Sequence, residues 1–177
     1  MGGWDRGVEF RDVLKRLVEF KESIRRRFRE KGELGRGKRR ALRNVNILIL
    51  ALANGLKLSE AMECYSKFVN TGEREVIVKV MKSKDKYRLC IVPPLIDTID
   101  IKLTKDLPIP RKQTIASFAE YHFNINTHSL RSAFIKHLLE KGLDITILSH
   151  RKLETLLAYI QERKAQEELA QIAKSIK

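Results

Sequence analysis

The chain has 177 residues, with 36 Lys or Arg against 22 Asp or Glu, which gives a formal net charge of +14. Its hydrophobic share of 43% excludes wholesale disorder and allows one well-buried domain with a helical arm. No run of about 18 apolar residues occurs and the N-terminus lacks a signal-peptide core, so neither a membrane-spanning helix nor a membrane partner is expected. The basic excess indicates a polyanionic partner, nucleic acid first, although proteins of heat-loving organisms share this composition.

The first predicted helix covers residues 8–28, where Phe10, Leu14, Leu17, Ile24 and Phe28 recur at helical spacing and the other face is charged. Residues 25–43 follow as the most basic stretch, with ten Lys or Arg and two acids. Three glycines at 32, 35 and 37 predict a flexible loop here. We interpret it as a DNA-contact loop, because ten like charges repel unless an anion neutralises them; a solvated linker is the alternative. The predicted contacts are Arg36, Lys38, Arg39, Arg40 and Arg43.

The middle of the chain predicts two helices and a hairpin. Residues 42–53 are almost wholly apolar and predict a buried helix, which Asn54-Gly55 ends with Gly55 in the left-handed position. Another helix is expected from Ser59. Residues 75–93 alternate at β spacing around a polar turn and predict a β-hairpin, which Pro93-Pro94 stops.

Residues 97–110 are expected to be irregular, and the rest of the chain helical. Helices are predicted near 112–121, near 129–141, around Ile145 and from Leu153 onward. The fold class is therefore mainly α with a small antiparallel β-hairpin. We divide the chain into an arm of helix and basic loop (1–40), a main domain (41–160) and a C-terminal helix (161–177). Cys64 and Cys90 fit no metal spacing and are expected to be buried and reduced, a disulfide being the less favoured alternative.

Two segments carry the candidate chemistry. His128 and Arg131 lie three residues apart at the start of a predicted helix, so they share one face and form a cationic corner suited to an anion. Further on, His150 and Tyr159 are nine residues apart. Tyr159 taken alone is as well explained as a core residue, because Leu156, Leu157 and Ile160 surround it. His122 and His137 are interpreted as structural or surface residues.

The order of these motifs resembles that of the tyrosine recombinase (phage integrase) family. The chain has His-x-x-Arg, then a helix with Leu-Leu-x-x-Gly, then a later His, and a Tyr nine residues after that His. Residues 54–61, Asn-Gly-Leu-Lys-Leu-Ser-Glu-Ala, are similar to the family's Thr-Gly-Leu-Arg-x-Ser-Glu-Leu segment, and the hairpin falls where the family has its lysine-bearing one. The resemblance covers roughly residues 40–160. With the composition, it favours an archaeal or archaeal-virus integrase of a heat-loving source.

The resemblance implies a mechanism and its residues. In the family a tyrosine attacks a DNA phosphodiester, forms a 3′-phosphotyrosyl link and releases a 5′-hydroxyl. Arginines clamp the phosphate oxygens, a hairpin lysine protonates the leaving oxygen, and histidines position the phosphate. Carried over, the catalytic residues are Tyr159, Arg131, His128, His150, Lys57 in the place of the first arginine, and Lys82 on the hairpin. Lys84 and Lys86 are the alternatives to Lys82 and further predicted DNA contacts.

Three departures bear on activity. Lys57 keeps a charge but cannot make the planar two-pronged contact of an arginine. The stretch from Gly142 to His150 is about four residues shorter than in the family, close to one helical turn. The chain has no room for the family's N-terminal DNA-clamping domain, so either residues 1–40 partly replace that domain or the chain is a fragment.

The resemblance leaves three functions open. The first is DNA cleavage and rejoining, in the integration or excision of a mobile element, by a tetramer on DNA whose C-terminal helix docks on a neighbour. The second is a recombinase-fold DNA-binding protein that lost efficient catalysis, and the third is relaxation of DNA by the same chemistry. No cofactor and no metal are expected, because no ligand spacing or P-loop occurs. The expected location is the cytoplasm, at the nucleoid or in the host cell of a virus or plasmid.

Overall fold

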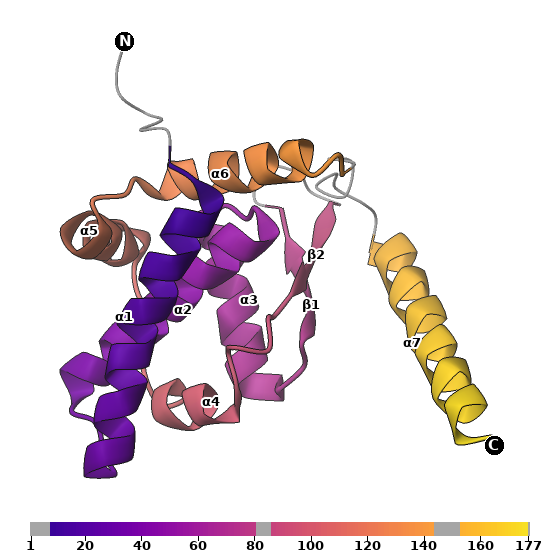
Figure 1. Cartoon of the computed structure of the whole chain (residues 1–177), viewed down its shortest axis with the longest axis horizontal. Helices are drawn as coiled ribbons and strands as arrows, with labels where there is room; N and C mark the ends of the chain where they lie inside the picture. The colour runs from indigo at the N-terminus through magenta and orange to yellow at the C-terminus, as the bar shows by residue number, and fades with distance from the viewer. Residues whose placement is uncertain (1–7, 81–85, 144–152, 177) are drawn as a thin grey trace.

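Helix α2 (Arg36–Asn54) is the centre of the computed structural model, which describes residues 8–80, 86–143 and 153–176. Every residue of α2 from 42 to 52 is buried, as expected for a helix covered on all sides. Helices α1 (Phe10–Lys31), α3 (Leu58–Thr71) and α6 (Thr127–Glu140) pack against it (Figure 1). The mainly α prediction with one small hairpin is confirmed for the described residues.

The basic stretch is mostly helical, and the predicted flexible loop is wrong. Gly32 ends α1 in the left-handed conformation (φ 74°), but Gly37 lies inside α2, which leaves only residues 32–35 between the two helices. A glycine costs a helix about 1 kcal/mol relative to alanine. The burial of the following eleven residues of α2 outweighs that cost.

Helix α1 is amphipathic as predicted, and it packs into the core formed by α2 and α6. Val13, Leu17 and Ile24 are buried there. Its buried Lys21 donates to the Asp100 carboxylate (2.6 Å) and to the Leu95 carbonyl (2.7 Å). Burial lowers the pKa of Lys21, although Asp100 acts to raise it.

Asp100 belongs to a helix that the sequence interpretation missed. Helix α4 (Thr98–Thr104) occupies part of the stretch that was expected to be irregular. Asp97 caps it by accepting from the backbone N–H groups of Ile99 and Asp100, and Asp100 accepts in return from the Asp97 N–H. Seven residues are too few for a periodic pattern, so the cap was the sequence signal that could have revealed this helix.

The predicted hairpin is confirmed. Strand β1 (Glu75–Lys79) pairs antiparallel with β2 (Tyr87–Ile91), with Val76 opposite Cys90 and Val78 opposite Arg88. These four side chains are buried. Cys64 and Cys90 are both free and buried, as predicted.

The last three helices begin and end close to their predicted positions. Helix α5 is Lys112–Phe123, α6 is Thr127–Glu140 and α7 is Leu153–Ser175; the helix expected near Ile145 falls outside the described residues. Helix α7 stands beside the hairpin, away from the other helices (Figure 1), and Arg163 pairs with Glu75 of β1. Within the described residues, no single helix is long and apolar enough to cross a membrane; α2 and α3 pass that test only together, as a pair bent by 115°.

Candidate phosphate-binding groove

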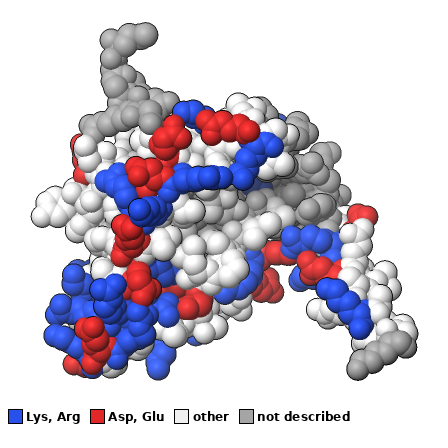
Figure 2. All heavy atoms as spheres, in the orientation of Figure 1, with Lys and Arg blue, Asp and Glu red and all other residues white. Residues whose placement is uncertain are grey.

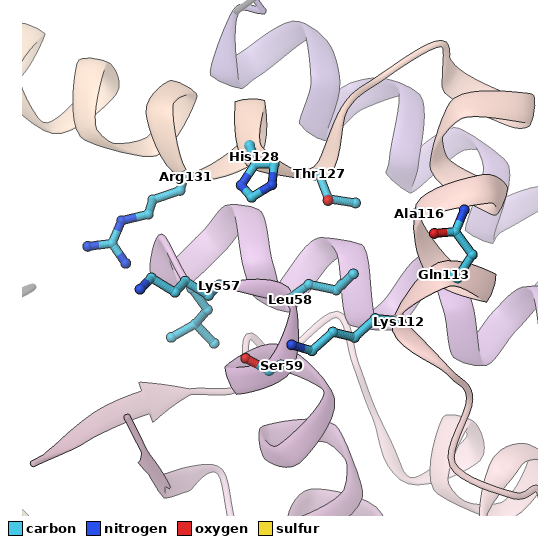
Figure 3. Close-up of a pocket in the computed structure, with 10 residues that line it drawn as sticks. Lys57, Leu58, Ser59, Lys112, Gln113, Ala116, Thr127, His128 and Arg131 are labelled. Carbon is cyan, nitrogen blue, oxygen red and sulfur yellow. The ribbon is translucent and has the colours of Figure 1, made fainter. Parts of the chain in front are cut away.

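A cavity of about 440 Å³ opens where the starts of α3, α5 and α6 meet (Figure 3). It brings together three predicted catalytic residues: Lys57, and the pair His128 and Arg131, which lies more than 70 residues later in the sequence. The other residues that line it are Leu56, Leu58, Ser59, Lys112, Gln113, Ala116 and Thr127. Among the described residues, none that lines the cavity is acidic.

The turn between α2 and α3 positions Lys57. Gly55 closes α2 in the left-handed conformation (φ 61°) as predicted, and Leu56 then inserts into the core. Lys57 is the residue before the first turn of α3, and its backbone N–H donates to Glu60 Oε1 (3.0 Å). Its side chain is exposed and reaches toward Arg131 (Figure 3).

The start of α6 positions the His-Arg pair. Asn126 caps the helix by accepting from the His128 N–H (3.0 Å). Ser129, Leu130, Ala133 and Phe134 are buried, which turns His128 and Arg131 outward together. Arg131 is half-buried, and its Nη1 is enclosed without a hydrogen-bond partner among the described residues. A guanidinium nitrogen in this condition is suited to an incoming anionic oxygen.

A buried arginine beneath the groove escaped the sequence interpretation. Arg88 of β2 donates to Glu60 Oε1 (2.8 Å) and lies near the backbone carbonyls of Asn54 and Gly55 (3.3 and 3.4 Å). Burial lowers the pKa of Arg88; Glu60 opposes the shift and nearby Arg131 adds to it. Because Glu60 also holds the Lys57 N–H, the hairpin is bonded to the turn that carries Lys57.

The other predicted catalytic residues are not placed around the groove. Lys82, Lys84 and His150 lie outside the described residues, and of Tyr159 only the backbone is described, as part of α7. Lys86 is exposed directly before β2.

The predicted DNA-contact residues of the basic stretch divide into three groups. Arg36, Lys38 and Arg40 are exposed at the start of α2, where Lys and Arg side chains gather in the lower left of Figure 2. Arg39 is half-buried and binds both carboxylate oxygens of Asp106 (2.7 and 2.9 Å). Arg43 is buried, so its prediction as a surface contact is wrong.

The helical path of α2 explains the burial of Arg43. The residue falls in the wholly buried part of this helix, next to Leu42. Its guanidinium donates to the Pro108 carbonyl (2.8 Å) and to Asn44 Oδ1 (2.9 and 3.0 Å). Burial lowers its pKa.

The remaining histidines pack against aromatic rings. His137 stacks on Phe10 with ring centres 4.2 Å apart, and His122 meets the edge of Phe20 at 5.0 Å. Over the described part of the chain, no group of three or more His, Cys, Asp or Glu side chains could hold a metal ion.

What the groove can do chemically follows from its lining. Three helix starts bring their positive partial charge to the groove, and Lys57, Lys112, Arg131 and His128 add cationic or hydrogen-donating side chains. Lys112 and its neighbours Ser59, Gln113 and Thr127 were missed, because nothing local in the sequence shows that they meet the motif residues. The arrangement suits an anionic group with several oxygens, such as a phosphate.

The chain is similar to proteins named as integrases and tyrosine recombinases. It is 30% identical to "Putative integrase ORF241" of Acidianus two-tailed virus, over 97% of this chain and 70% of that protein. It is 28% identical to "Putative integrase V10" of Sputnik virophage (91% and 86%) and 26% identical to "Tyrosine recombinase XerC" of Rickettsia bellii (67% and 47%). No family model and no solved structure matches it. The motif, the mainly helical fold with its hairpin, and these relatives together show that the chain belongs to the tyrosine recombinase (integrase) family.

Proposed function

We propose that this protein cleaves and rejoins DNA strands through Tyr159, in the integration or excision of a mobile element. The single observation that carries the proposal is the meeting of Lys57, His128 and Arg131 around one groove whose described lining contains no acidic residue. Residues 57 and 131 are 74 positions apart and were matched to one phosphate-binding site from the sequence alone. The integrase and recombinase names of the relatives support the same reaction class.

In the proposed reaction the scissile phosphate occupies the groove. Lys57 and Arg131 neutralise its non-bridging oxygens, with Arg131 Nη1 supplying a donor that has no other described partner. The Tyr159 hydroxyl gives its proton to one of the histidines, His128 or His150, as its oxygen attacks phosphorus; the bond to the 5′-oxygen breaks, and a 3′-phosphotyrosyl link forms. A hairpin lysine, Lys82 with Lys84 or Lys86 as alternatives, gives its proton to the leaving 5′-oxygen. His128 and His150 orient the phosphate, and attack by a 5′-hydroxyl reverses the step.

A second function is favoured by one specific observation, the lysine at position 57. Loss of one preorganised transition-state contact costs about 10²–10³ in rate. A recombinase-fold protein that binds DNA but cleaves it poorly would keep the groove and act as a regulator or accessory factor.

The proposed partners are double-stranded DNA and further copies of the chain. Exposed Arg36, Lys38 and Arg40 would contact the DNA backbone away from the groove. Leu169, Ile172 and Ile176 of the C-terminal segment are exposed and would dock on a neighbouring copy in a tetramer.

Trapping a covalent complex separates the two functions. The probe is a pool of duplexes that carry a nick and randomised flanking sequence, so that the released fragment diffuses away. The wild-type protein should form an adduct that survives denaturation, and Tyr159→Phe should form none. Tight DNA binding without any adduct would instead establish the binding-protein reading.

Lys57→Arg tests the assignment of the first cation. It should raise the rate of adduct formation, by up to about 10²–10³, because it restores the two-pronged contact. A rate that stays unchanged or falls contradicts the placement of Lys57 at the phosphate.

A further inference from the structure

The motif residues occupy only part of the groove, and α5 lines the rest. Lys112 and Gln113 are the first two residues of α5, and both line the cavity. In Figure 3, Lys57 and Arg131 come from one side, while Lys112 extends from α5 on the other side toward Ser59. No recombinase motif matched in this sequence includes residues 112 and 113.

The position of α5 is fixed by the core and not by the groove. Its Ile115, Ala119 and Phe123 are buried, and Arg16 of α1 donates to the Phe123 carbonyl (2.6 Å). At the other end, buried Arg43 donates to the Pro108 carbonyl, four residues before Lys112. These contacts anchor α5 at both ends, so its first turn is held over the groove in the absence of any ligand.

The charge of the groove exceeds what one phosphate neutralises. A phosphodiester carries a single negative charge, which Lys57 and Arg131 already outnumber. Lys112 adds a third permanent cation, and none of the described residues that line the cavity is an acid that would offset it. Like charges gathered in one cavity cost free energy unless anions neutralise them. A DNA strand supplies a further negative charge at each following phosphate.

We propose that Lys112 forms a second phosphate-binding position, for a phosphate next to the scissile one on the same strand. Lys112 Nζ pairs with a non-bridging oxygen of that phosphate, whereas the Gln113 side-chain amide donates to Ser117 Oγ of its own helix (3.2 Å). Two occupied positions define the direction of the strand as it crosses the groove, which orients the scissile bond. The inference rests on the proposed function only in naming the first phosphate as the one that is cleaved.

The test counts phosphates by the salt dependence of binding, which needs no known target sequence. Affinity for a fluorescein-labelled random 20-bp duplex is measured by anisotropy over a range of salt concentrations. Each neutralised phosphate contributes about 0.9 to the slope of log K against log salt. Lys112→Met should lower the slope by about 0.9 and the affinity roughly three- to tenfold. Lys105→Met is the control, an exposed lysine that does not line the groove, and should change neither.

The triple variant Lys57→Met/Arg131→Met/Lys112→Met distinguishes two phosphates from one, because it removes both cations of the scissile phosphate together with Lys112. If Lys112 neutralises a different phosphate from Lys57 and Arg131, the slope falls by about 1.8; if all three share one, it falls by no more than about 0.9. The smaller value overturns the proposal, as does an unchanged slope for Lys112→Met. Lys112→Arg should retain the wild-type slope, and thermal melting of each variant verifies folding.

Adduct formation gives a separate readout. At saturating protein, Lys112→Met should slow formation of the covalent complex by roughly several-fold, because the strand is less well oriented, and a loss of about 100-fold would place Lys112 at the scissile phosphate instead. Complete absence of adduct in every variant, with the slope changes intact, would remove the proposed cleavage and leave the second phosphate position standing.

Discussion

The two ends of α2 both carry cations, but the two sets of cations are used differently. Near the start of this helix, Arg25 and Arg29 of the last turns of α1 and Arg39 of α2 itself are bound to acids of the chain, namely Asp97 with Asp100, Glu22, and Asp106. Beyond the end of the helix, the described residues that line the groove include no acid. Nineteen residues at about 1.5 Å each give this helix a length of about 28 Å, which separates the two sets of cations. Several cations of the basic stretch therefore stabilise the fold through ion pairs within the chain, whereas the few cations of the groove remain available to a ligand.

The start of α2 nevertheless keeps some unneutralised charge. Its first turn contains no acidic residue, and Arg36, Lys38 and Arg40 are exposed there. Cations at a helix N-terminus oppose the helix dipole and cost the helix several tenths of a kcal/mol each. That cost fits a surface that an external polyanion neutralises.

The largest effect should follow a change in the groove. Arg131→Ala removes a contact made to the reacting phosphate and should lower the rate of adduct formation by about 10²–10³. Arg40→Ala, an exposed arginine at the opposite end of α2, should leave that rate unchanged at saturating protein. Single-turnover trapping with the nicked duplexes measures both. Equal losses in the two variants would show that the ends do not differ in function.

The next largest effect concerns a cation that forms a buried ion pair within the chain. Lys21→Met removes one partner of a buried pair with Asp100, in which both side chains are at most 6% exposed. Breaking such a pair should cost about 3 kcal/mol of unfolding free energy, the lower end of the usual range because Arg25 still pairs with Asp100. Urea denaturation measures the loss.

Lys15→Met on the same helix is the matched control. Lys15 is exposed and pairs only loosely with Glu19 (4.0 Å), so the change should stay within about 0.5 kcal/mol. A similar cost for both lysines would contradict the internal role of Lys21.

The sequence predicted the features that depend on local patterns, and it did not predict those that depend on packing between distant segments. Local patterns identified the long helices, the hairpin, the left-handed Gly55 and the motif residues His128 and Arg131. Local patterns gave wrong predictions where packing between helices determines the conformation or burial of a residue. Gly37 was treated as a helix breaker, and Arg43 as a surface cation, because burial of α2 is not visible in a count of charges.

The groove shows the same limit. Lys57 was matched to the site through the family resemblance, but Lys112 has no motif and reaches the groove only because α5 packs on α2. Arg88 reads as an ordinary strand residue until its pairing with Glu60 is seen. Whether a cation can bind a ligand depends on its partners in the folded chain, which the sequence alone does not show.

A smaller effect is expected from the exposed cations at the start of α2. The triple change Arg36→Ala, Lys38→Ala and Arg40→Ala should reduce the slope of log K against log salt by up to about 2.7, or 0.9 for each lost phosphate contact. Anisotropy with the random duplex measures it. Arg39→Ala alone should change the slope little, since Asp106 already neutralises this arginine. If the triple variant has the same slope as the wild type, these three cations do not contact DNA phosphates and are only solvated.

The smallest effect tests whether the start of α2 is helical in solution. Gly37 lies inside the helix with open space where a Cβ would be, so Gly37→Ala should stabilise the fold by about 0.4–1 kcal/mol. Gly32, five residues earlier, also has open space but sits at φ 74°, so Gly32→Ala should destabilise by about 1 kcal/mol. Thermal melting should therefore shift in opposite directions, by roughly 2–4 °C per kcal/mol. Two shifts of the same sign would mean that residues 36–40 form the flexible loop that the glycines suggest, with their cations free to follow the DNA.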